Sequence, residues 1–268
     1  MNTFRVQSSK FKVAVLILLV LLTALVASPP YASAMLTARA NHDHITVDFF
    51  YHGSTVSIRG ISEPGTDLVI KVTSPEGHQV LKKKGKVAGA LWMNVGQLKF
   101  EKTPNFYEVF STKKLNDILS TEEMDNHVIG YSALAKHIEI TPAANEAEKE
   151  TWFNEFVKYK EDTRLYTSSF GKIETTMTAE GKQQYYILTD WPYQAAPGDY
   201  LVTVYAVKNN KVVEQAEAKV NVEQVGIVKA LAGMAKEKAA VYGLLSIGIA
   251  LSAGFGVGMV FRKGGGSH

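Results

Sequence analysis

The 268-residue chain contains no cysteine, which excludes disulfides, thiol redox chemistry, c-type haem and cysteine-ligated iron–sulfur clusters within it. Its formal charge of +3 comes from 29 basic and 26 acidic residues, but three basic residues, Arg5, Lys10 and Lys12, precede the first apolar run. The rest of the chain is balanced in charge, which excludes the basic footprint that nucleic-acid binding requires.

The first 34 residues have the pattern of a secretory signal peptide. The basic residues are followed by the apolar run 13–27, by two prolines and by the cleavage motif A-S-A at 32–34. An uncleaved N-terminal anchor is the alternative, although the apolar run is short for a membrane span. We expect residues 1–34 to be removed and the remainder to be exported.

A cluster of polar residues follows the predicted cleavage site. Because side chains at i and i+2 of a strand point to the same side, His42 and His44, with Asp43 between them, could chelate a divalent metal. The alternative is a set of solvated side chains in a terminal segment. This segment is the candidate metal site of an exported metal- or small-ligand-binding module.

Period-two alternation and β-branched residues predict that residues 35–226 form one mainly β exported domain. The expected strands are 45–49, 55–61, 68–72, 79–87, 90–95, 173–177, 185–188, 200–207 and 212–222. Turns about every ten residues favour an immunoglobulin-like β-sandwich, and Pro197-Gly198-Asp199-Tyr200 enters a strand as the penultimate strand of that fold is entered. Asn209-Asn210 predicts a tight hairpin.

The strands at 79–87 and 90–95 carry a basic cluster formed by Lys82, Lys83, Lys84 and Lys86. One interpretation is the solvated tip of a hairpin, and the other is contact with an anion or a lipid headgroup. Trp92 is expected to be a core or inter-sheet anchor, because burying one aromatic removes about 150–250 Å² from water.

The apolar period becomes helical over about 111–165, which predicts a helical insertion between the early and late strands. Ser120 with Glu123 is typical of a capping box, and Thr141-Pro142 predicts the start of a longer helix. The apolar stripe of that helix is expected to pack on the sheet, or alternatively to bind a partner; it comprises Trp152, Phe153, Phe156 and Tyr159. Two small domains are the alternative to one sandwich with an insertion.

The C-terminal segment predicts a membrane anchor. Residues 227–240 are expected to form a juxtamembrane helix, and the uncharged run 241–261 is long enough to cross a hydrocarbon core of about 30 Å. The basic pair that follows should stay in the cytoplasm with the short tail 262–268. We therefore expect a single-pass protein of the bacterial inner membrane with its main domain in the periplasm. The final G-G-G-S-H resembles a linker and carries no functional inference.

Small residues mark one side of the predicted span. Gly254 and Gly258 form a G-x-x-x-G motif, and Gly243 and Ser252 add further small surfaces. Small residues let helices approach closely, so we expect helix–helix docking, either as a homodimer or on a polytopic partner. The alternative is that glycine is simply frequent in spanning helices.

Several segments together resemble a known family. They are Gly85–Gly89 leading to Trp92-Met93-Asn94, Pro104–Tyr107, Pro197–Tyr200 and the run from Val241 to Lys263. Over nearly the whole mature chain, the sequence resembles the putative transmembrane protein family first described from alphaproteobacteria. The resemblance implies a companion of sulfite-exporter-type permeases and supplies no catalytic residues.

The motifs of common enzyme classes are missing from the sequence: G-x-S-x-G, H-E-x-x-H, the P-loop and G-x-G-x-x-G. We therefore expect a non-enzymatic accessory subunit without a cofactor. Its expected partner is an integral membrane protein, an anion or organosulfur permease. The metal- or small-ligand-binding module is the alternative function.

Overall fold

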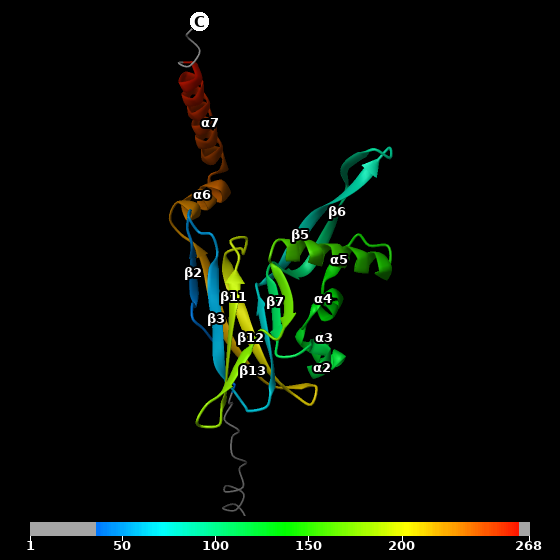
Figure 1. Ribbon diagram of the computed structural model, residues 1–268. Helices are drawn as coiled ribbons and strands as arrows, with labels where there is room; N and C mark the ends of the chain where they lie inside the picture. Colours follow the sequence, from blue (N-terminus) through cyan, green and yellow to red (C-terminus); the bar gives the residue numbers. More distant parts are fainter. Residues whose placement is uncertain (1–35, 263–268) are drawn as a thin grey trace, which may run out of the picture. The chain divides into compact units, whose positions relative to one another are not determined.

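The computed structural model describes residues 36–262, so the predicted signal peptide and the G-G-G-S-H tail lie outside the described residues. The described residues are mainly β, with 44% strand and 31% helix. Strands far apart in the sequence pair with one another (Figure 1), and within the described residues they form three sheets.

Two of these sheets are large. The four-stranded sheet is antiparallel and has the order β1 (Arg39–Ala40), β3 (Ser54–Ser62), β11 (Gln183–Trp191), β10 (Glu174–Met177). The six-stranded sheet has the order β2 (His44–Val47), β13 (Lys211–Gln224), β12 (Gly198–Lys208), β4 (Asp67–Thr73), β7 (Tyr107–Ser111), β9 (Tyr166–Phe170). In the six-stranded sheet β2 runs parallel to β13 and β9 parallel to β7, whereas the other pairs are antiparallel.

The two large sheets pack face to face around one apolar core. Strand β11 alternates buried and exposed residues along its whole length, as expected for a strand with one face in a core. Trp191 of β11 stacks on Phe106, just before β7, with ring centroids 4.9 Å apart. It also meets Tyr200 of β12 edge to face at 4.7 Å. Side chains of one sheet therefore fill the inner face of the other.

The turn between β12 and β13 confirms the predicted Asn209-Asn210 hairpin. Both asparagines have positive φ angles, 53° and 63°. A two-residue turn with positive φ at both positions matches the right-handed twist of the strands that it joins, and asparagine tolerates that conformation. The Asn-Asn pair was a specific signal because few residue types accept a positive φ angle.

The segment between β7 and β9 contains α2 (Leu115–Ile118), α3 (Thr121–His127), α4 (Tyr131–His137), β8 (Glu139–Thr141) and α5 (Glu146–Asp162). Ser120 caps α3 as predicted, because its Oγ accepts a hydrogen bond from the Glu123 backbone N–H at 3.2 Å. The reciprocal half of the predicted capping box is wrong, since the Glu123 carboxylate accepts from the Val212 N–H at 3.0 Å and the Ser120 N–H donates to the Asn210 carbonyl at 3.0 Å. The predicted start of the longer helix at Thr141-Pro142 is wrong. Thr141 pairs with Lys99 in a sheet, and Asn145 caps α5 instead.

The third sheet is a long hairpin, β5 (Glu76–Val87) and β6 (Leu91–Pro104), joined at its base by β8. The prediction that Trp92 is a core or inter-sheet anchor is wrong, because Trp92 lies at the far tip of this hairpin and is 67% exposed. Residues 91–97 of its strand are all exposed and belong to the third sheet, so neither large sheet covers Trp92. The buried tryptophan of the core is Trp191.

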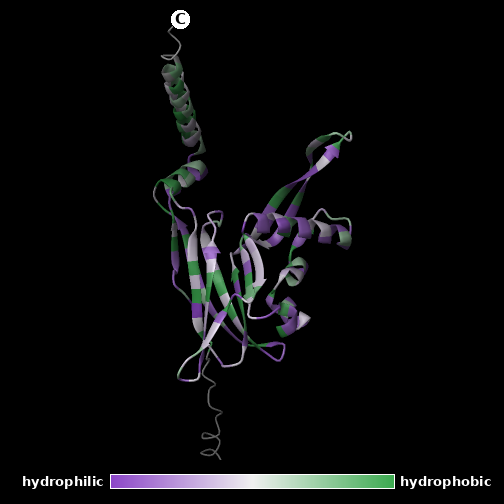
Figure 2. Cartoon of the chain, viewed as in Figure 1, coloured by the Kyte–Doolittle hydropathy of each residue, from purple (hydrophilic) through white to green (hydrophobic). Residues whose placement is uncertain are grey.

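Two helices follow β13: α6 (Gly226–Glu237) and α7 (Ala239–Arg262). Within α7, Ala239–Met259 is apolar and long enough to cross a membrane, and no part of it is buried against the rest of the described chain. Figure 2 shows α7 as hydrophobic along nearly its whole length. This length and composition match those of a membrane-spanning helix, as the sequence predicts.

Candidate functional site

The start of α6, the exposed Phe49 and Phe50, and a polar cleft all lie at one end of the six-stranded sheet. Strand β12 is antiparallel to both neighbours, and its Leu201 lies opposite Thr73 of β4 and Lys219 of β13. Strands β4 and β13 therefore run in the same direction, and β2 is parallel to β13. We call the end where β2, β4 and β13 finish the anchor-side end, because β13 continues there into α6 and α7.

Two exposed phenylalanines follow β2 at the anchor-side end. Phe49 and Phe50 are 71% and 76% exposed, and their rings meet edge to face at 5.2 Å. They lie beside the start of α6, because the Val225 N–H donates to the carbonyl oxygen of Val47 at 3.0 Å. The two rings form a small exposed apolar patch at the anchor-side end.

A cleft of about 790 Å³ opens at the same end, between the two large sheets. Its lining includes buried Glu108, Thr189 and Trp191, and around them lie side chains of both charges: His52, Asp162, Arg164, Lys172 and Asp190. Ser54 and Trp191, which pair across β3 and β11, mark its edge. Most of the lining residues are polar or charged, and Phe110, Leu188 and Trp191 are among the apolar ones, so the cleft offers hydrogen-bonding groups to a polar solute.

Glu108 is a buried carboxyl group in this cleft, 4% exposed. It accepts a hydrogen bond from Thr189 Oγ1 at 2.7 Å, which links β7 to β11. Burial raises the pKa of Glu108 to about 7, an effect that the Thr189 hydrogen bond and the charge of Lys172 oppose. The group therefore changes charge near neutral pH. When protonated it can donate a hydrogen bond to a ligand, and when ionised it can accept one from a ligand.

Replacing Glu108 with glutamine is expected to remove a pH dependence of stability. Because the pKa of the folded state, about 7, exceeds the ordinary value of 4.5, the folded chain binds the proton more tightly than the unfolded chain. As the pH rises from about 4.5 to about 7, the free energy of unfolding of the unaltered chain should fall by about 1.4 kcal/mol per pH unit. Thermal unfolding of the full chain in detergent at pH 5 and pH 8 measures this slope.

The matched control for this measurement is Glu174→Gln, on the exposed edge strand β10, which should keep the slope of the unaltered chain. A Glu108→Gln variant with an unchanged slope would show that another group causes the dependence.

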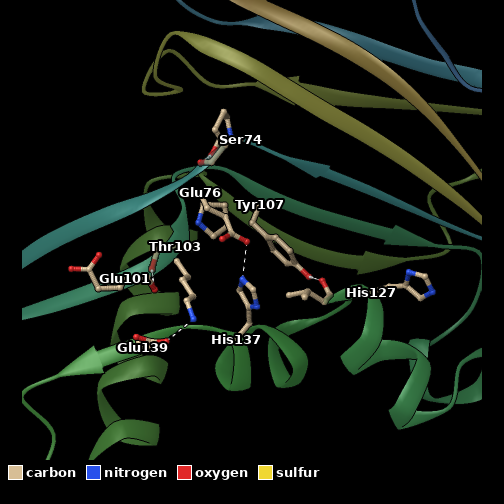
Figure 3. Close-up of polar contacts among 12 residues, drawn as sticks. Ser74, Glu76, Glu101, Thr103, Tyr107, His127, His137 and Glu139 are labelled. Atoms are coloured by element: carbon tan, nitrogen blue, oxygen red, sulfur yellow. Dashed lines mark hydrogen bonds and ion pairs between the residues drawn. The ribbon is translucent and has the colours of Figure 1, made fainter.

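The base of the hairpin is tied to the helical segment by a hydrogen bond and an ion pair (Figure 3). His137 of α4 lies 2.7 Å from the carboxylate of Glu76, at the start of β5. Lys102 of β6 donates to Glu139 of β8 at 2.6 Å, which raises the pKa of Lys102 and lowers that of Glu139. These contacts hold both strands of the hairpin against the same helical segment.

Helix α5 adds an apolar brace to the hairpin. Phe156 stacks on Phe100 of β6 with ring centroids 4.5 Å apart. The buried Lys160 donates to the backbone oxygen and Oδ1 of Asn105 at 3.1 and 3.0 Å, and burial lowers its pKa to about 8. The predicted apolar stripe of this helix is divided, because Phe153 and Phe156 are buried whereas Tyr159 is exposed. Phe156, in the buried part of the stripe, packs on the hairpin sheet through Phe100.

The predicted basic cluster lies on β5 of the hairpin, behind its tip. Lys82, Lys84 and Lys86 are exposed. Lys83 turns toward α5, where its Nζ lies 4.4 Å from the ring centroid of Trp152 and 3.8 Å from Glu148 Oε1. Three of the four lysines are therefore free for contact outside the chain.

The predicted metal segment lies in and before β2. His42, Asp43 and His44 are exposed, and Nε2 of His44 lies 3.9 Å from Glu223. Among residues 36–262, no group of three or more His, Cys, Asp or Glu side chains is arranged to hold a metal ion. Metal binding by this segment stays a prediction.

The small residues of α7 form two separate strips. At about 100° per residue, Gly243, Gly254 and Gly258 fall within an arc of roughly 60°. Ser252 lies roughly 160° around the helix from Gly254. It belongs with Gly248 to a shallow groove on another face, and its hydroxyl donates to the Gly248 carbonyl at 2.8 Å. The predicted docking set is thus divided between two faces.

Sequence reasoning missed Glu108 and the two phenylalanines after β2. The signal for Glu108 was available, because it is a charged residue inside the otherwise buried run Y-E-V-F-S. A charged side chain is rarely buried without a specific partner. Its partner Thr189 is 81 residues away in the sequence, so the cleft itself could not be deduced.

Comparison with known families identifies the chain. A family model described as Putative transmembrane protein (Alph_Pro_TM) matches residues 35–263. Comparison with curated proteins gives no match. The family description and the uncovered apolar helix α7 agree that the protein is associated with a membrane. Because the model covers nearly the whole chain after the predicted signal peptide, the chain belongs to the putative transmembrane protein family Alph_Pro_TM.

Proposed function

We propose that the protein is a non-enzymatic, membrane-anchored accessory subunit of an integral membrane protein, an anion or organosulfur permease. The observation that carries this proposal is the shared location of the anchor and the cleft. Helices α6 and α7 leave the anchor-side end, where the Glu108 cleft and the exposed Phe49 and Phe50 also lie. The cleft end of the β domain faces the bilayer and the outer mouth of the partner.

The orientation across the membrane follows from the sequence pattern. Residues 1–34 direct export and are removed, and the basic pair Arg262-Lys263, which follows the apolar run 241–261, stays in the cytoplasm. The main domain then lies in the periplasm of a bacterial cell, with one span in the inner membrane. An immunoglobulin-like fold is supported by Tyr200, whose hydroxyl donates to the Ala196 carbonyl at 2.5 Å in the manner of a tyrosine corner.

Leucines at Gly254 and Gly258 are expected to release the partner. The two substitutions, Gly254→Leu and Gly258→Leu, fill the strip that lets a second helix approach closely. The amount of partner captured with the full chain from mildly solubilised native membranes should fall about tenfold, which corresponds to a loss of about 1.4 kcal/mol of binding free energy. Quantitative mass spectrometry of the captured material measures the ratio.

The matched control is Gly248→Leu with Ser252→Leu, which adds similar volume to the other face of α7. Equal capture by the Gly254→Leu, Gly258→Leu variant and the unaltered chain would contradict docking through this strip. Capture of a second copy of the chain in place of a polytopic protein would assign the strip to a homodimer.

A second function, binding of a small ligand by the exported domain, is favoured by the cleft itself. The buried Glu108 and the mixed charges around it suit a small polar solute. Thermal unfolding of the full chain with amino acids, organic sulfonates, Zn²⁺ and Cu²⁺ tests this function. A shift that Glu108→Gln abolishes assigns the cleft, and a metal-dependent shift that depends on His42 and His44 assigns the N-terminal segment.

A further inference from the structure

The β5–β6 hairpin has the composition of a lipid-contacting element. Its tip, residues 87–93, reads V-A-G-A-L-W-M and contains no charged side chain. From His78 to Phe100 the sequence has five lysines and no aspartate or glutamate. An apolar tip behind which lysines gather matches the order of layers at an anionic membrane surface, hydrocarbon first and headgroups next.

The tip is open to its surroundings in the described chain. Leu91 and Trp92 are 66% and 67% exposed, and Met93 is half exposed. Trp92 pairs with Lys86 across the hairpin, and the Lys86 Nζ lies 5.4 Å from its ring centroid. Tryptophan beside a cation is favoured at the level of lipid headgroups, where the ring is partly in hydrocarbon and the charge is in water.

The spacing of the lysines fits the thickness of a headgroup layer. At about 3.3 Å per residue, Lys86 and Lys84 lie roughly 3 and 10 Å behind Val87. An interfacial element buries its apolar part about 5–10 Å into the membrane surface. The exposed lysines are therefore placed to meet phosphates while the tip meets acyl chains.

The hairpin leaves the sheets from the anchor-side end. It follows β4, which finishes at Thr73, level with Lys219 of β13. From Lys219 the path to α7 comprises five further residues of β13, Val225, the twelve residues of α6 and Lys238, at most about 41 Å. From Thr73, which is level with Lys219, the 14 further residues to Val87 extend at most about 46 Å, so the length of the hairpin suffices to reach the membrane that α7 crosses.

The hairpin is also held as a stiff unit. Its base is fixed by the Glu76–His137 and Lys102–Glu139 pairs (Figure 3), and its stem by the stacking of Phe100 on Phe156. A braced element loses less conformational freedom when it binds, so more of its contact energy appears as affinity. The helical segment between β7 and β9 supplies these braces.

We propose that the β5–β6 hairpin is a second membrane contact, whose tip around Trp92 enters the interface of an anionic bilayer while Lys82, Lys84 and Lys86 bind lipid phosphates. With α7 it gives the exported domain two points of attachment to one membrane. Two attachments restrict how the domain can tilt and turn over the bilayer. This contact does not depend on the presence of a permease.

The experiment uses the absence of cysteine, which allows one label to be placed by Leu91→Cys in the full chain. The labelled chain is reconstituted in vesicles of phosphatidylcholine with about one-third phosphatidylglycerol, and quenching by bromine on the lipid acyl chains is compared with quenching by aqueous iodide. We expect strong quenching by the lipid and weak quenching by iodide. The matched control, a label placed by Lys211→Cys at the opposite end of the sheet, should show the reverse.

Replacing Lys82, Lys84 and Lys86 together with glutamine should shift the ratio of inserted to free tip about 100-fold, since each lysine near an anionic surface contributes about fivefold. These side chains are exposed, so an unchanged melting temperature is expected and separates lost contact from lost folding. Iodide access at position 91 equal to that at the Lys211→Cys control would overturn the proposal. Equal insertion into pure phosphatidylcholine, or protection that requires an added membrane protein, would also overturn it.

Discussion

Replacing Trp191 with alanine is expected to lower the free energy of unfolding by about 3–5 kcal/mol. The side chain is 1% exposed and lies between Phe106 and Tyr200, with ring centroids 4.9 and 4.7 Å away. Its removal leaves a cavity at the place where the two large sheets meet, and the rings around it cannot close the space. Chemical denaturation of the full chain in detergent, followed by circular dichroism, measures the loss.

The chain offers a matched control in Trp92→Ala, which removes the same atoms from an exposed site. We expect this control to change stability by less than about 0.5 kcal/mol. Similar losses for the two variants would contradict the assignment of Trp191 to the core and Trp92 to the hairpin tip.

Replacing Gly60 with alanine is expected to destabilise the protein by about 1–3 kcal/mol or more. A Cβ atom at this position of β3 would lie 1.7 Å from the Thr37 carbonyl oxygen and 2.5 Å from the Tyr185 hydroxyl. The same hydroxyl donates to the Thr37 oxygen at 2.5 Å, so alanine breaks a contact that holds the first described segment on the sheet. Thermal unfolding and hydrogen exchange of β1 measure the effect.

Gly96→Ala is the control for Gly60→Ala, because a Cβ at Gly96 of β6 meets nothing within 4 Å. Alanine there should be neutral or slightly stabilising, since glycine in a strand is costly in conformational entropy. Equal melting temperatures for the two variants would show that the close approach of Thr37 to β3 does not exist in solution.

Local patterns predicted much of the fold. The Asn209-Asn210 turn, the Ser120 cap and the apolar helix after Ala239 each depend on a few adjacent residues, and each is present in the structure. The start of α5 was misplaced because a threonine before a proline suits a cap as well as a strand end. Pairing of Thr141 with Lys99, 42 residues earlier, decided between them.

Long-range arrangement could not be predicted from these patterns. Trp92 and Trp191 are both in apolar alternating strands, and only the layering of the sheets shows that one is uncovered and the other enclosed. The cleft depends on Glu108 and Thr189 from different sheets. The location of the hairpin and the anchor at one end depends on strand direction, which the sequence of a single strand does not reveal.

The most direct test of the proposed arrangement measures which end of the β domain lies near the membrane. A donor dye is attached by Tyr193→Cys, beside the cleft, or by Lys211→Cys, the first residue of β13. Lys211 pairs with Lys208 at the far end of β12, whose 11 residues span about 35 Å. Energy transfer to an acceptor in the outer headgroup layer of proteoliposomes should be strong from position 193 and weak from position 211. Equal transfer from both positions, or stronger transfer from position 211, would contradict a domain that faces the bilayer with its cleft end.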